Sequence, residues 1–413
     1  MKLAKLSLAA IVVAGLASSS FAADTLADAF KNGSVNGELK AYYFSKDDGS
    51  KTEDLFTTGV TLGYKTASFY GLSLGLTFQG NSSPFADGAV NDTPALRTGG
   101  KGMFQGSEYG TGAQLSEAYL AYNIGKTTAM VGRMFLDTPL VASSGSRMTK
   151  DSFEGAAIIN TDLPNTTLIA GYVQKGQDRT DGKGSIGKFT KTFATGSADP
   201  VPADDGAFTL AAINKSITGL TLTAAYAYAN DLIQISYAEV LYEGKVGAVG
   251  YNLAGQYYYN KFDNAIVSPG EDDSINAYGL KAGASFKGIN GYVAYSKVSN
   301  DNVATGAVIS GLGNGADLLY TNPVINGANY GADVEAYAAD LNYDITSAAN
   351  VGARYVETKD KSAAITEKVS FTSVYGYYKF DGALKGLKLG VEYEDLGKDK
   401  DGNDLWVKAG YKF

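Results

Sequence analysis

Hydrophobic and polar residues alternate with a period of two along much of the chain. The C-terminal segment shows this most clearly, because apolar residues take every second position: Leu405, Val407, Ala409, Tyr411 and Phe413. The intervening positions hold charged residues, a glycine and the only tryptophan: Asp404, Trp406, Lys408, Gly410 and Lys412. Successive side chains of a β-strand point to opposite faces, whereas a helix repeats its apolar positions every three to four residues. The alternation therefore predicts strands that have an apolar face and a wet face.

Segments with this alternation recur along the chain. They predict eighteen strands, at residues 34–44, 54–66, 71–80, 113–123, 127–136, 152–160, 166–175, 206–215, 219–229, 232–243, 249–260, 275–286, 289–298, 332–343, 350–358, 367–380, 386–396 and 403–413. Short connections, such as 123–126 and 287–288, fall at one end of these strands. Long connections fall at the other end, at 81–112, 137–151, 176–205, 261–274 and 299–331. Short periplasmic turns and long extracellular loops are typical of outer-membrane barrels.

The predicted fold class is therefore all-β, a transmembrane antiparallel β-barrel of about 18 strands. An even number of strands closes the sheet, so that backbone N–H and C=O groups in the hydrocarbon are hydrogen-bonded. A barrel of this width leaves a water-filled channel instead of a packed core. Sixteen strands are possible, because the connections at 229–232 and 243–249 are poorly defined. A soluble β-sandwich or solenoid is the alternative, but it leaves the asymmetry of the connections unexplained.

The first 22 residues have the pattern of an export signal. Lys2 and Lys5 precede an apolar run at 6–17, and small residues follow it at Ser20 and Ala22. This pattern predicts cleavage between Ala22 and Ala23. The run is 12 residues long, whereas a membrane-spanning helix needs about 20. We therefore divide the chain into a signal peptide, 1–22, and a barrel domain, 23–413.

Composition excludes several classes of function. Without Lys2 and Lys5 the chain has 33 basic against 43 acidic residues, a net charge of −10, so a nucleic-acid partner is not expected. The chain contains 29 tyrosines, whose amphipathic rings suit a boundary between apolar and aqueous surroundings, so many side chains are expected at such a boundary. The chain contains no histidine and no cysteine. A barrel hydrolase that uses a histidine base is therefore disfavoured, and a structural or adhesive surface barrel is the other alternative to a channel.

Two loop motifs resemble ligand sites only in part. The segment GKGSIGK (182–188) has P-loop spacing, but Phe189 follows the lysine where the motif needs Ser or Thr. The segment DKDGND (399–404) starts with calcium-ligand spacing, yet its glycine comes too early for an EF-hand. A hairpin turn explains the second motif better. No cofactor and no metal site are therefore predicted, apart from weak calcium binding by acidic loops such as 271–273.

Three blocks of sequence are similar to the OprD family of porins, including its major-outer-membrane-protein branch. They are ADTLADAFKNGSVNGELKAYYF (23–44), LSEAYLAYNIGKTTAMVGRMFLDTPLV (115–141) and SRMTKDSFEG (146–155), and LGNGADLLYTN (312–322) resembles a family loop. The resemblance implies an 18-stranded barrel narrowed by inward-folded loops, at 137–151 and 299–331. It also implies basic positions at Arg133 and Arg147 and an acidic one at Asp137. The chain departs from carboxylate-specific members, because its five arginines are too few for a long basic ladder.

The function implied is that of an outer-membrane porin for passive diffusion of small hydrophilic solutes and ions. Its candidate pore-lining residues are Arg133, Asp137, Arg147, Glu117, Glu154, Lys40, Lys281 and Arg354. The acidic mature chain favours mild cation selectivity. Tyr411 and Phe413 resemble the signal read by the barrel-assembly machinery, a further expected partner. Outer-membrane lipid and lipopolysaccharide are expected around the barrel, and a homotrimer is one possible assembly.

Overall fold

The computed structural model describes residues 23–84, 102–104, 108, 110–195, 201–362 and 366–413. The predicted signal peptide, including Ala22, lies outside the described residues. Ala23 is buried, and its backbone N–H donates to the carbonyl of Ser68 at 2.8 Å. It packs with Ala67 and with Ala29 of the short helix α2 (Leu26–Lys31).

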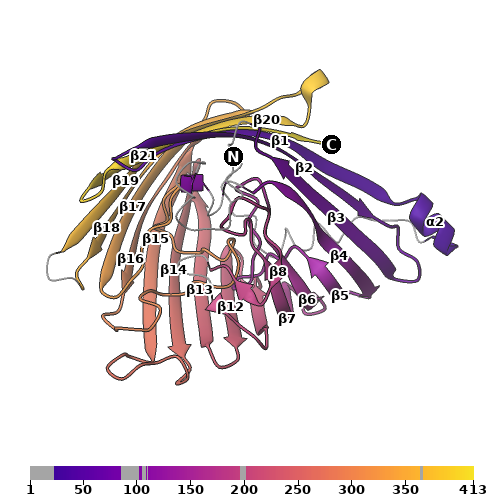
Figure 1. Cartoon of the computed structure of the whole chain (residues 1–413), viewed down its shortest axis with the longest axis horizontal. Coiled ribbons are helices and arrows are strands. Elements are labelled where there is room, and N and C mark those ends of the chain that lie inside the picture. Colours follow the sequence, from indigo (N-terminus) through magenta and orange to yellow (C-terminus); the bar gives the residue numbers. More distant parts are fainter. Residues whose placement is uncertain (1–22, 85–101, 105–107, 109, 196–200, 363–365) are drawn as a thin grey trace.

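Eighteen antiparallel strands form one closed barrel. They are β1 (Ser34–Asp47), β2 (Thr52–Lys65), β3 (Leu72–Ser82), β4 (Gly112–Ile124), β5 (Thr127–Met134), β6 (Ser152–Asn160), β7 (Thr166–Gln177), β11 (Ala207–Asn214), β12 (Leu220–Ala229), β13 (Ile233–Val246), β14 (Val249–Phe262), β15 (Ser274–Phe286), β16 (Ile289–Val298), β17 (Val334–Asp344), β18 (Ala349–Asp360), β19 (Glu367–Lys379), β20 (Leu387–Lys398) and β21 (Gly402–Lys412). Each strand pairs with the next along this series, and β1 pairs with β21 to close the ring (Figure 1).

The remaining elements are short. The strand β8 (Phe189–Thr190) extends the edge of β7, and β9 (Thr192–Phe193) pairs with β10 (Val201–Pro202). The 3-10 turns in the described part of the chain are η2 (Gly102–Phe104) and η3 (Gly382–Leu384). Among the described residues, no helix is long and apolar enough to cross a membrane.

The predicted strands agree with the structure. All eighteen predicted segments match a barrel strand, and their ends differ by no more than three residues. The prediction of about 18 strands is therefore confirmed, and the alternative of 16 is wrong. The two poorly defined connections are tight turns, which leave only 230–232 and 247–248 outside the strands.

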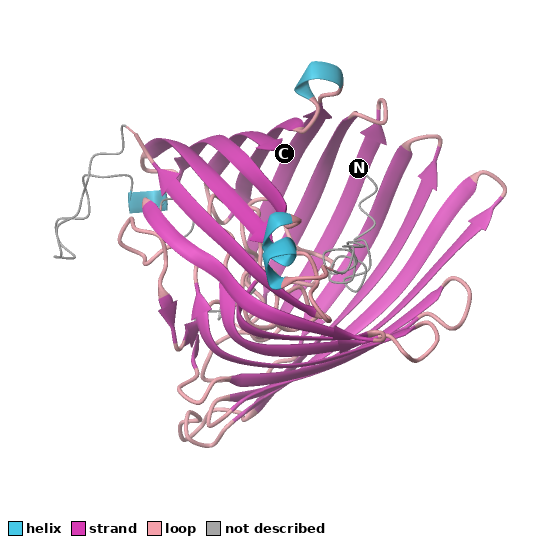
Figure 2. Cartoon of the chain, turned by 90° about the vertical axis from the view of Figure 1, so that its right-hand side faces the viewer, coloured by secondary structure: helices cyan, strands magenta, loops and turns pink. Residues whose placement is uncertain are grey.

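The two ends of the barrel differ in the length of their connections (Figure 2). At one end β15 and β16 are joined by two residues, Lys287 and Gly288, both with positive φ (47° and 87°). Such a pair forms the two-residue turn that matches the twist of antiparallel strands. At the other end residues 299–333 join β16 to β17. In barrels of the outer membrane the end with the long loops is the extracellular one.

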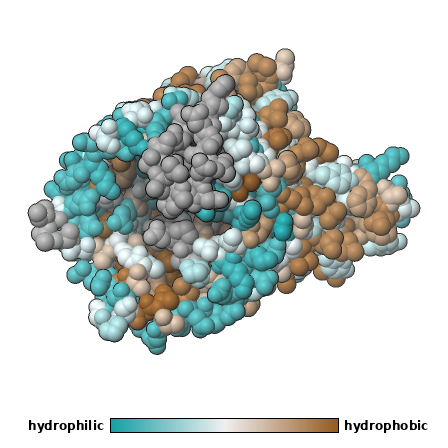
Figure 3. All heavy atoms as spheres, viewed as in Figure 1, coloured by the Kyte–Doolittle hydropathy of each residue, from teal (hydrophilic) through white to brown (hydrophobic). Residues whose placement is uncertain are grey.

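The alternation along the strands places apolar side chains outside and polar ones inside. On β21, Val407 and Tyr411 are 40% and 39% exposed on the outer face, while Trp406 is 2% exposed on the inner face. Hydrophobic residues cover the right-hand part of the surface in Figure 3, and hydrophilic residues gather at its left and lower edges. The outer face can therefore contact lipid, while the inner face meets water and the loops.

Candidate constriction site

Two long loops run inside the ring of strands (Figure 1). The third loop (residues 135–151) joins β5 to β6, and the seventh loop (residues 299–333) joins β16 to β17. They pair with each other, because Ala142 N donates to Leu312 O at 3.0 Å and Leu312 N donates to Leu140 O at 2.8 Å. Apolar side chains of both loops are almost fully buried at this contact: Leu140, Val141, Val308, Ile309 and Leu312. The barrel thus holds a small hydrophobic cluster within its lumen.

Local sequence shapes both loops at this contact. In the third loop the Thr138 hydroxyl accepts a hydrogen bond from Val141 N at 3.0 Å, and Pro139 between them fits the turn. In the seventh loop Gly313 has φ +88°, and a Cβ there would lie 2.3 Å from the carbonyl oxygen of Ala142. Glycine is therefore the only residue that allows this close approach.

Inward side chains of the wall bind the backbone of the third loop. The Lys40 ammonium on β1 donates to Met148 O at 3.0 Å. On β3 the Gln79 side chain donates to Lys150 O at 2.8 Å and accepts from Lys150 N at 2.9 Å. Asn81 donates to the Thr149 hydroxyl at 2.6 Å. These bonds fix the end of the third loop against β1 and β3.

The seventh loop is held by side chains of β14 and β20. The Glu394 carboxylate on β20 accepts hydrogen bonds from three successive backbone amides of the loop, at 2.8, 3.2 and 2.8 Å, those of Val324, Ile325 and Asn326. On β14 the Asn260 side chain donates to Ile309 O at 3.1 Å and accepts from Ile309 N at 2.7 Å. A charged acceptor on three amides is a strong anchor, because charge-assisted bonds exceed neutral ones.

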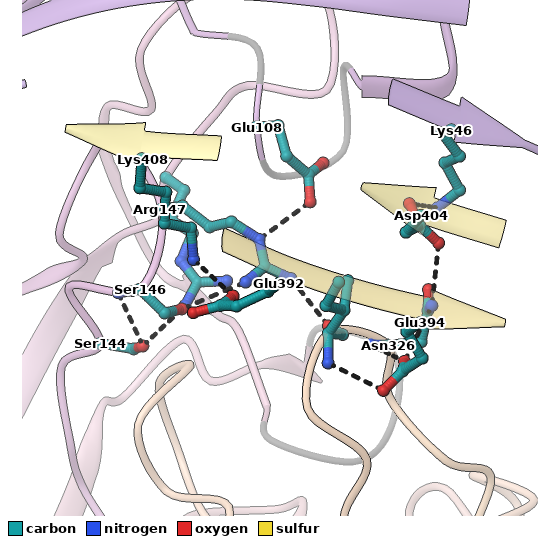
Figure 4. Close-up of polar contacts among 12 residues, drawn as sticks. Lys46, Glu108, Ser144, Ser146, Arg147, Asn326, Glu392, Glu394, Asp404 and Lys408 are labelled. Atoms are coloured by element: carbon teal, nitrogen blue, oxygen red, sulfur yellow. Dashed lines mark hydrogen bonds and ion pairs between the residues drawn. The ribbon is translucent and has the colours of Figure 1, made fainter. Parts of the chain in front are cut away.

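Arg147 of the third loop joins these parts (Figure 4). Its guanidinium lies 3.8 Å from the centre of the Trp406 ring on β21. Arg147 Nε pairs with Glu108 Oε1 at 2.8 Å, and Nη2 donates to Ile325 O of the seventh loop at 3.2 Å. A guanidinium can do all this at once because its five N–H donors lie in one plane that also stacks on aromatic rings. Arg147 therefore contacts the wall and the seventh loop together.

Ion pairs on the inner face continue beside Trp406. Lys408 Nζ lies 2.8 Å from Glu392 Oε2 and 4.1 Å from the centre of the Trp406 ring. Asp404 accepts a hydrogen bond from the Asn326 side chain at 2.9 Å and lies 4.0 Å from Lys46 Nζ. Figure 4 shows these residues on β1, β20 and β21 facing Arg147 and Asn326. Lys46 and Lys408 therefore flank three neighbouring carboxylates, those of Asp404, Glu392 and Glu394, on this part of the wall.

Arg354 makes a second contact between wall and loop. Its Nε pairs with Asp340 Oδ2 at 3.0 Å, and Nη1 donates to Asn322 O of the seventh loop at 3.0 Å. The Tyr375 hydroxyl donates to Asp340 Oδ2 at 2.9 Å. Arg354 thus lies on the inner face, and its charge is balanced by a buried carboxylate.

Asp151 lies at the junction of the third loop and β6. Its carboxylate accepts from Ser144 N at 2.5 Å and from Asn314 N of the seventh loop at 2.9 Å. Burial raises the pKa of the Asp151 carboxyl above its ordinary value. Burial also lowers the pKa of the nearby Arg179 guanidinium to about 10, and this side chain donates to the Ser146 hydroxyl at 3.1 Å. Charged groups at this junction have therefore lost most of their hydration.

Arg133 lies apart from Arg147. It pairs with Glu154 Oε2 at 3.0 Å, and Lys175 pairs with Glu154 Oε1 at 3.1 Å. The Arg133 guanidinium also lies 4.3 Å from the centre of the Phe189 ring. In the alternation of β5, Arg133 has the same parity as Val131, which is 58% exposed on the outer face. The contribution of this trio to the field of the pore stays a prediction.

The other candidate residues have separate surroundings. Glu117 accepts from the Thr77 hydroxyl and from Phe135 N. Asp137 pairs through its backbone with Ala142 inside the third loop, and Lys281 lies 4.3 Å from the centre of the Tyr320 ring of the seventh loop. Within the described part of the chain, no group of three or more His, Cys, Asp or Glu side chains could hold a metal ion. Weak calcium binding by the acidic loops stays a prediction.

The sequence missed the contacts that hold the loops. Alternation already placed Asp404, Trp406 and Lys408 on the wet face of their strand, but it contains no sign of their partners. Glu394 lies 68 residues from Asn326, and Arg147 lies 178 residues from Ile325. An anchor of this kind depends on the path of a loop through the lumen, which no local pattern specifies.

Comparison with known proteins extends this picture. A family model described as outer membrane porin, OprD family, matches residues 30–392. None of the curated protein sequences compared with the chain matches it. The structure of Pseudomonas aeruginosa OpdK with vanillate is similar at a TM-score of 0.75 and 15% identity, covering 93% of this chain and 99% of that one.

Two further structures show the same likeness. P. aeruginosa OccK9 (OpdG) has a TM-score of 0.78 at 15% identity, with the same coverage of 93% and 99%. Acinetobacter baumannii OccAB1 has a TM-score of 0.72 at 14% identity, covering 95% of this chain and 99% of that chain. At such identities the likeness concerns the fold.

Proposed function

The chain belongs to the OprD family of outer-membrane porins, and from this premise we propose that solutes cross its lumen past the third and seventh loops, with a weak preference for cations. Members of this family are outer-membrane channels through which small solutes diffuse. The family and the fold of this chain are those of channels and not of enzymes. The proposal concerns where the channel is narrowest and which charge it prefers.

The observation that supports this constriction is the pairing of the two loops inside the ring. The third loop is bonded to β1 and β3, the seventh loop to β14 and β20, and each to the other. Loops held at so many points give the channel beside them a fixed cross-section, and a fixed cross-section is needed to select solutes by size. Arg147 lies at their junction and helps to position both.

The weak cation preference follows from the distribution of charge. Inner-face charges around the loops are paired, as in Lys408–Glu392 and Arg354–Asp340, so their fields largely cancel. The predicted mature chain carries a net charge of −10. Acidic groups at the mouth concentrate cations within a Debye length of about 8 Å at physiological salt. The preference should therefore weaken as the salt concentration rises.

A reversal potential in a KCl gradient across a planar bilayer tests this charge preference. We expect a sign that favours potassium, with a magnitude that falls between 0.1 M and 1 M salt as the Debye length shortens from about 10 to 3 Å. A sign that favours chloride would contradict the cation preference and leave the position of the constriction untouched.

Passage of carboxylates is the second candidate function. Lysines from three strands share the inner face, and they are Lys40, Lys388, Lys408 and Lys412. OpdK, whose structure contains vanillate, is a structural neighbour. If carboxylates use this face, vanillate should block potassium current, and Lys388→Gln with Lys412→Gln should remove the block. Equal block in the double variant would contradict this second function.

The remaining partners are proposals of the same kind. Recognition by the barrel-assembly machinery is supported by the outward positions of Tyr411 and Phe413, which are 39% and 52% exposed. A homotrimer is testable by measuring the mass of the protein in detergent. A single-protomer mass would contradict that assembly without affecting the channel function.

A further inference from the structure

Charge is distributed unevenly between the two ends of the barrel. At the end with the long loops, the connections 263–273 and 299–333 contain no lysine or arginine and seven acidic residues, which are Asp263, Glu271, Asp272, Asp273, Asp301, Asp317 and Asp333. At the opposite end, three short turns contain one lysine each and no acidic residue, and they lie at 125–126, 215–219 and 287–288. The acidic excess of the chain therefore belongs to the extracellular end.

The two acidic connections are bound to each other. Asp272 N donates to Asn302 O at 2.7 Å, and Asn302 N donates to Asp272 Oδ2 at 2.7 Å. This contact keeps the 263–273 connection beside the start of the seventh loop, which runs from the rim into the ring (Figure 1). The extracellular mouth of the lumen is therefore acidic, and a mouth of this charge concentrates cations.

Three inward lysines lie at the periplasmic ends of β19, β20 and β21, which are neighbours in the ring (Figure 1). Lys379 is the last residue of β19, Lys388 the second residue of β20, and Lys412 the last residue of β21. Each lysine has the same parity as a buried inward residue of its own strand, and these residues are Ser373, Glu394 and Trp406. The periplasmic end of the inner face thus carries three neighbouring ammonium groups.

These three lysines are not neutralised by carboxylates. Lys379 and Lys388 are directly opposite each other in the register, which is unfavourable for like charges. Among the described residues, no carboxylate lies within ion-pair distance of Lys379, Lys388 or Lys412. Lys388 Nζ lies instead 4.1 Å from the centre of the Tyr377 ring. The positive charge of these lysines therefore acts on the lumen.

Other inward charges at this end leave the lysines in excess. Lys65, the last residue of β2, is a further inward lysine. Glu38 on β1 and Asp344 on β17 are inward carboxylates, while Lys245 and Glu243 on β13 balance each other. The lysines of the short turns add to the same sign. The periplasmic mouth is therefore basic, and it concentrates anions.

Between the two mouths the constriction holds charges in pairs. These pairs are Arg147–Glu108 at 2.8 Å, Arg354–Asp340 at 3.0 Å and Lys408–Glu392 at 2.8 Å. Their fields largely cancel, so the pairs separate the acidic mouth from the basic mouth without adding a strong field of their own. An ion that crosses the lumen therefore passes two regions of opposite fixed charge in sequence.

We propose that the lumen is a bipolar channel, which collects cations at its extracellular mouth and anions at its periplasmic mouth and therefore conducts better in one direction. This polarity rests on the proposed path of ions past the third and seventh loops. When the extracellular side is positive, each kind of ion enters through the mouth that attracts it, and both accumulate at the constriction. When the voltage is reversed, each ion must enter through the mouth that repels it, so the constriction is depleted of carriers. The favoured direction moves cations into the periplasm and anions out of it.

Single-channel currents of the full mature protein in a planar bilayer test this polarity. Ser50→Cys in the extracellular turn 48–51 fixes the orientation, because the chain has no other cysteine and streptavidin on the biotinylated thiol changes the current from one side only. At 0.1 M KCl we expect about twofold more current with the extracellular side positive than at the opposite voltage. At 1 M the ratio should approach one, because the Debye length falls from about 10 to 3 Å. Equal currents at 0.1 M, or a larger current at the opposite voltage, would overturn the proposal.

A KCl gradient gives a second measurement. The mouth that faces dilute salt is less screened, so its charge dominates the selectivity. We expect the preference for potassium to be stronger when the dilute side is extracellular than when it is periplasmic. An equal preference for potassium in both directions would contradict the bipolar arrangement and leave the cation preference of the proposed function intact.

Variants identify the residues responsible. The test variant replaces the three inward lysines, by Lys379→Gln, Lys388→Gln and Lys412→Gln, and its current ratio at 0.1 M should fall to about one. The matched control removes the same charge from turns at the same end, by Lys126→Gln, Lys215→Gln and Lys287→Gln, and it should keep most of the asymmetry. Heat-modifiable migration on a gel verifies that both variants are folded. An equal loss of asymmetry in the two variants would overturn the assignment to the inward lysines.

Discussion

At the scale of single residues, Arg147 shows how one side chain can set the geometry of a pore. Its guanidinium stacks on Trp406 and bonds to Glu108 and to Ile325 O. The family resemblance implied a basic position at Arg147. The structure shows in addition a mechanical role, because the same group holds the third loop to the wall and to the seventh loop.

Arg147→Ala should release this contact at a cost of about 2 kcal/mol, the range of a partly buried cation–π pair with charged hydrogen bonds. We expect a larger single-channel conductance and more open-channel noise. Trp406 is the only tryptophan, so its fluorescence emission reports the change directly. Arg147→Lys is the control that keeps the charge and loses the planar stack. Emission and conductance unchanged in Arg147→Ala would contradict the role of the stack.

Burial of the single carboxyl group of Asp151 predicts that the stability of the protein depends on pH. Burial raises the pKa of its carboxyl in the folded protein, so the folded state binds a proton more readily than the unfolded chain. The contribution of the Asp151 carboxyl to the free energy of unfolding should therefore rise as the pH falls through the raised pKa. The same contribution should be lost as the pH increases through that pKa. The measurement is the unfolding midpoint of wild type and Asp151→Asn at several pH values. If the unfolding midpoints of the two proteins differ by the same amount at every pH, the Asp151 carboxyl does not titrate over the pH range measured, and the prediction is wrong.

At the scale of elements, strands and loops differ in how far the sequence predicts them. The alternation on β21 assigned Trp406 and Val407 to opposite faces, and both assignments are confirmed. Such a strand needs only its own period of two to specify its faces. The seventh loop depends instead on Asn260 and Glu394, which lie far away in the chain. Its inward position came from family resemblance, and its anchors could not be predicted.

Glu394 tests the anchoring of the seventh loop. Glu394→Gln replaces a carboxylate, which has two acceptor oxygens, by an amide, which has one. The three loop amides then lose part of their acceptor, and each amide left without a hydrogen bond destabilises the loop by about 1–3 kcal/mol. We expect faster hydrogen exchange in residues 318–330. Glu392→Gln is the matched control, because Glu392 lies on the same face of β20 and binds Lys408 and Tyr377. Faster exchange in both variants alike would refute a specific anchor.

At the scale of the whole molecule, closure of the ring depends on its two ends. Gly37 N donates to Phe413 O at 3.0 Å, and Phe413 N donates to Gly37 O at 3.1 Å. The Phe413 ring lies outside, 6.2 Å from that of Tyr411. The last residue therefore takes part in the seam between β1 and β21 as well as in the predicted assembly signal.

Deletion of Phe413 should leave unfolded protein in the periplasm, because both a seam bond pair and the terminal aromatic ring are lost. Heat-modifiable migration on a gel measures the folded fraction. Phe413→Tyr keeps the backbone bonds and an aromatic ring, so it should fold normally. A truncated protein that inserts as well as wild type would show that neither contribution is needed.

The pairing of the third and seventh loops has an evolutionary consequence. These loops bond to each other and to the inner wall, whereas the turn at 48–51 bonds within itself and touches the 399–401 turn. Substitutions in such an outer turn leave the paired loops and their anchors in place, so the exposed surface and the permeability of the channel can evolve independently.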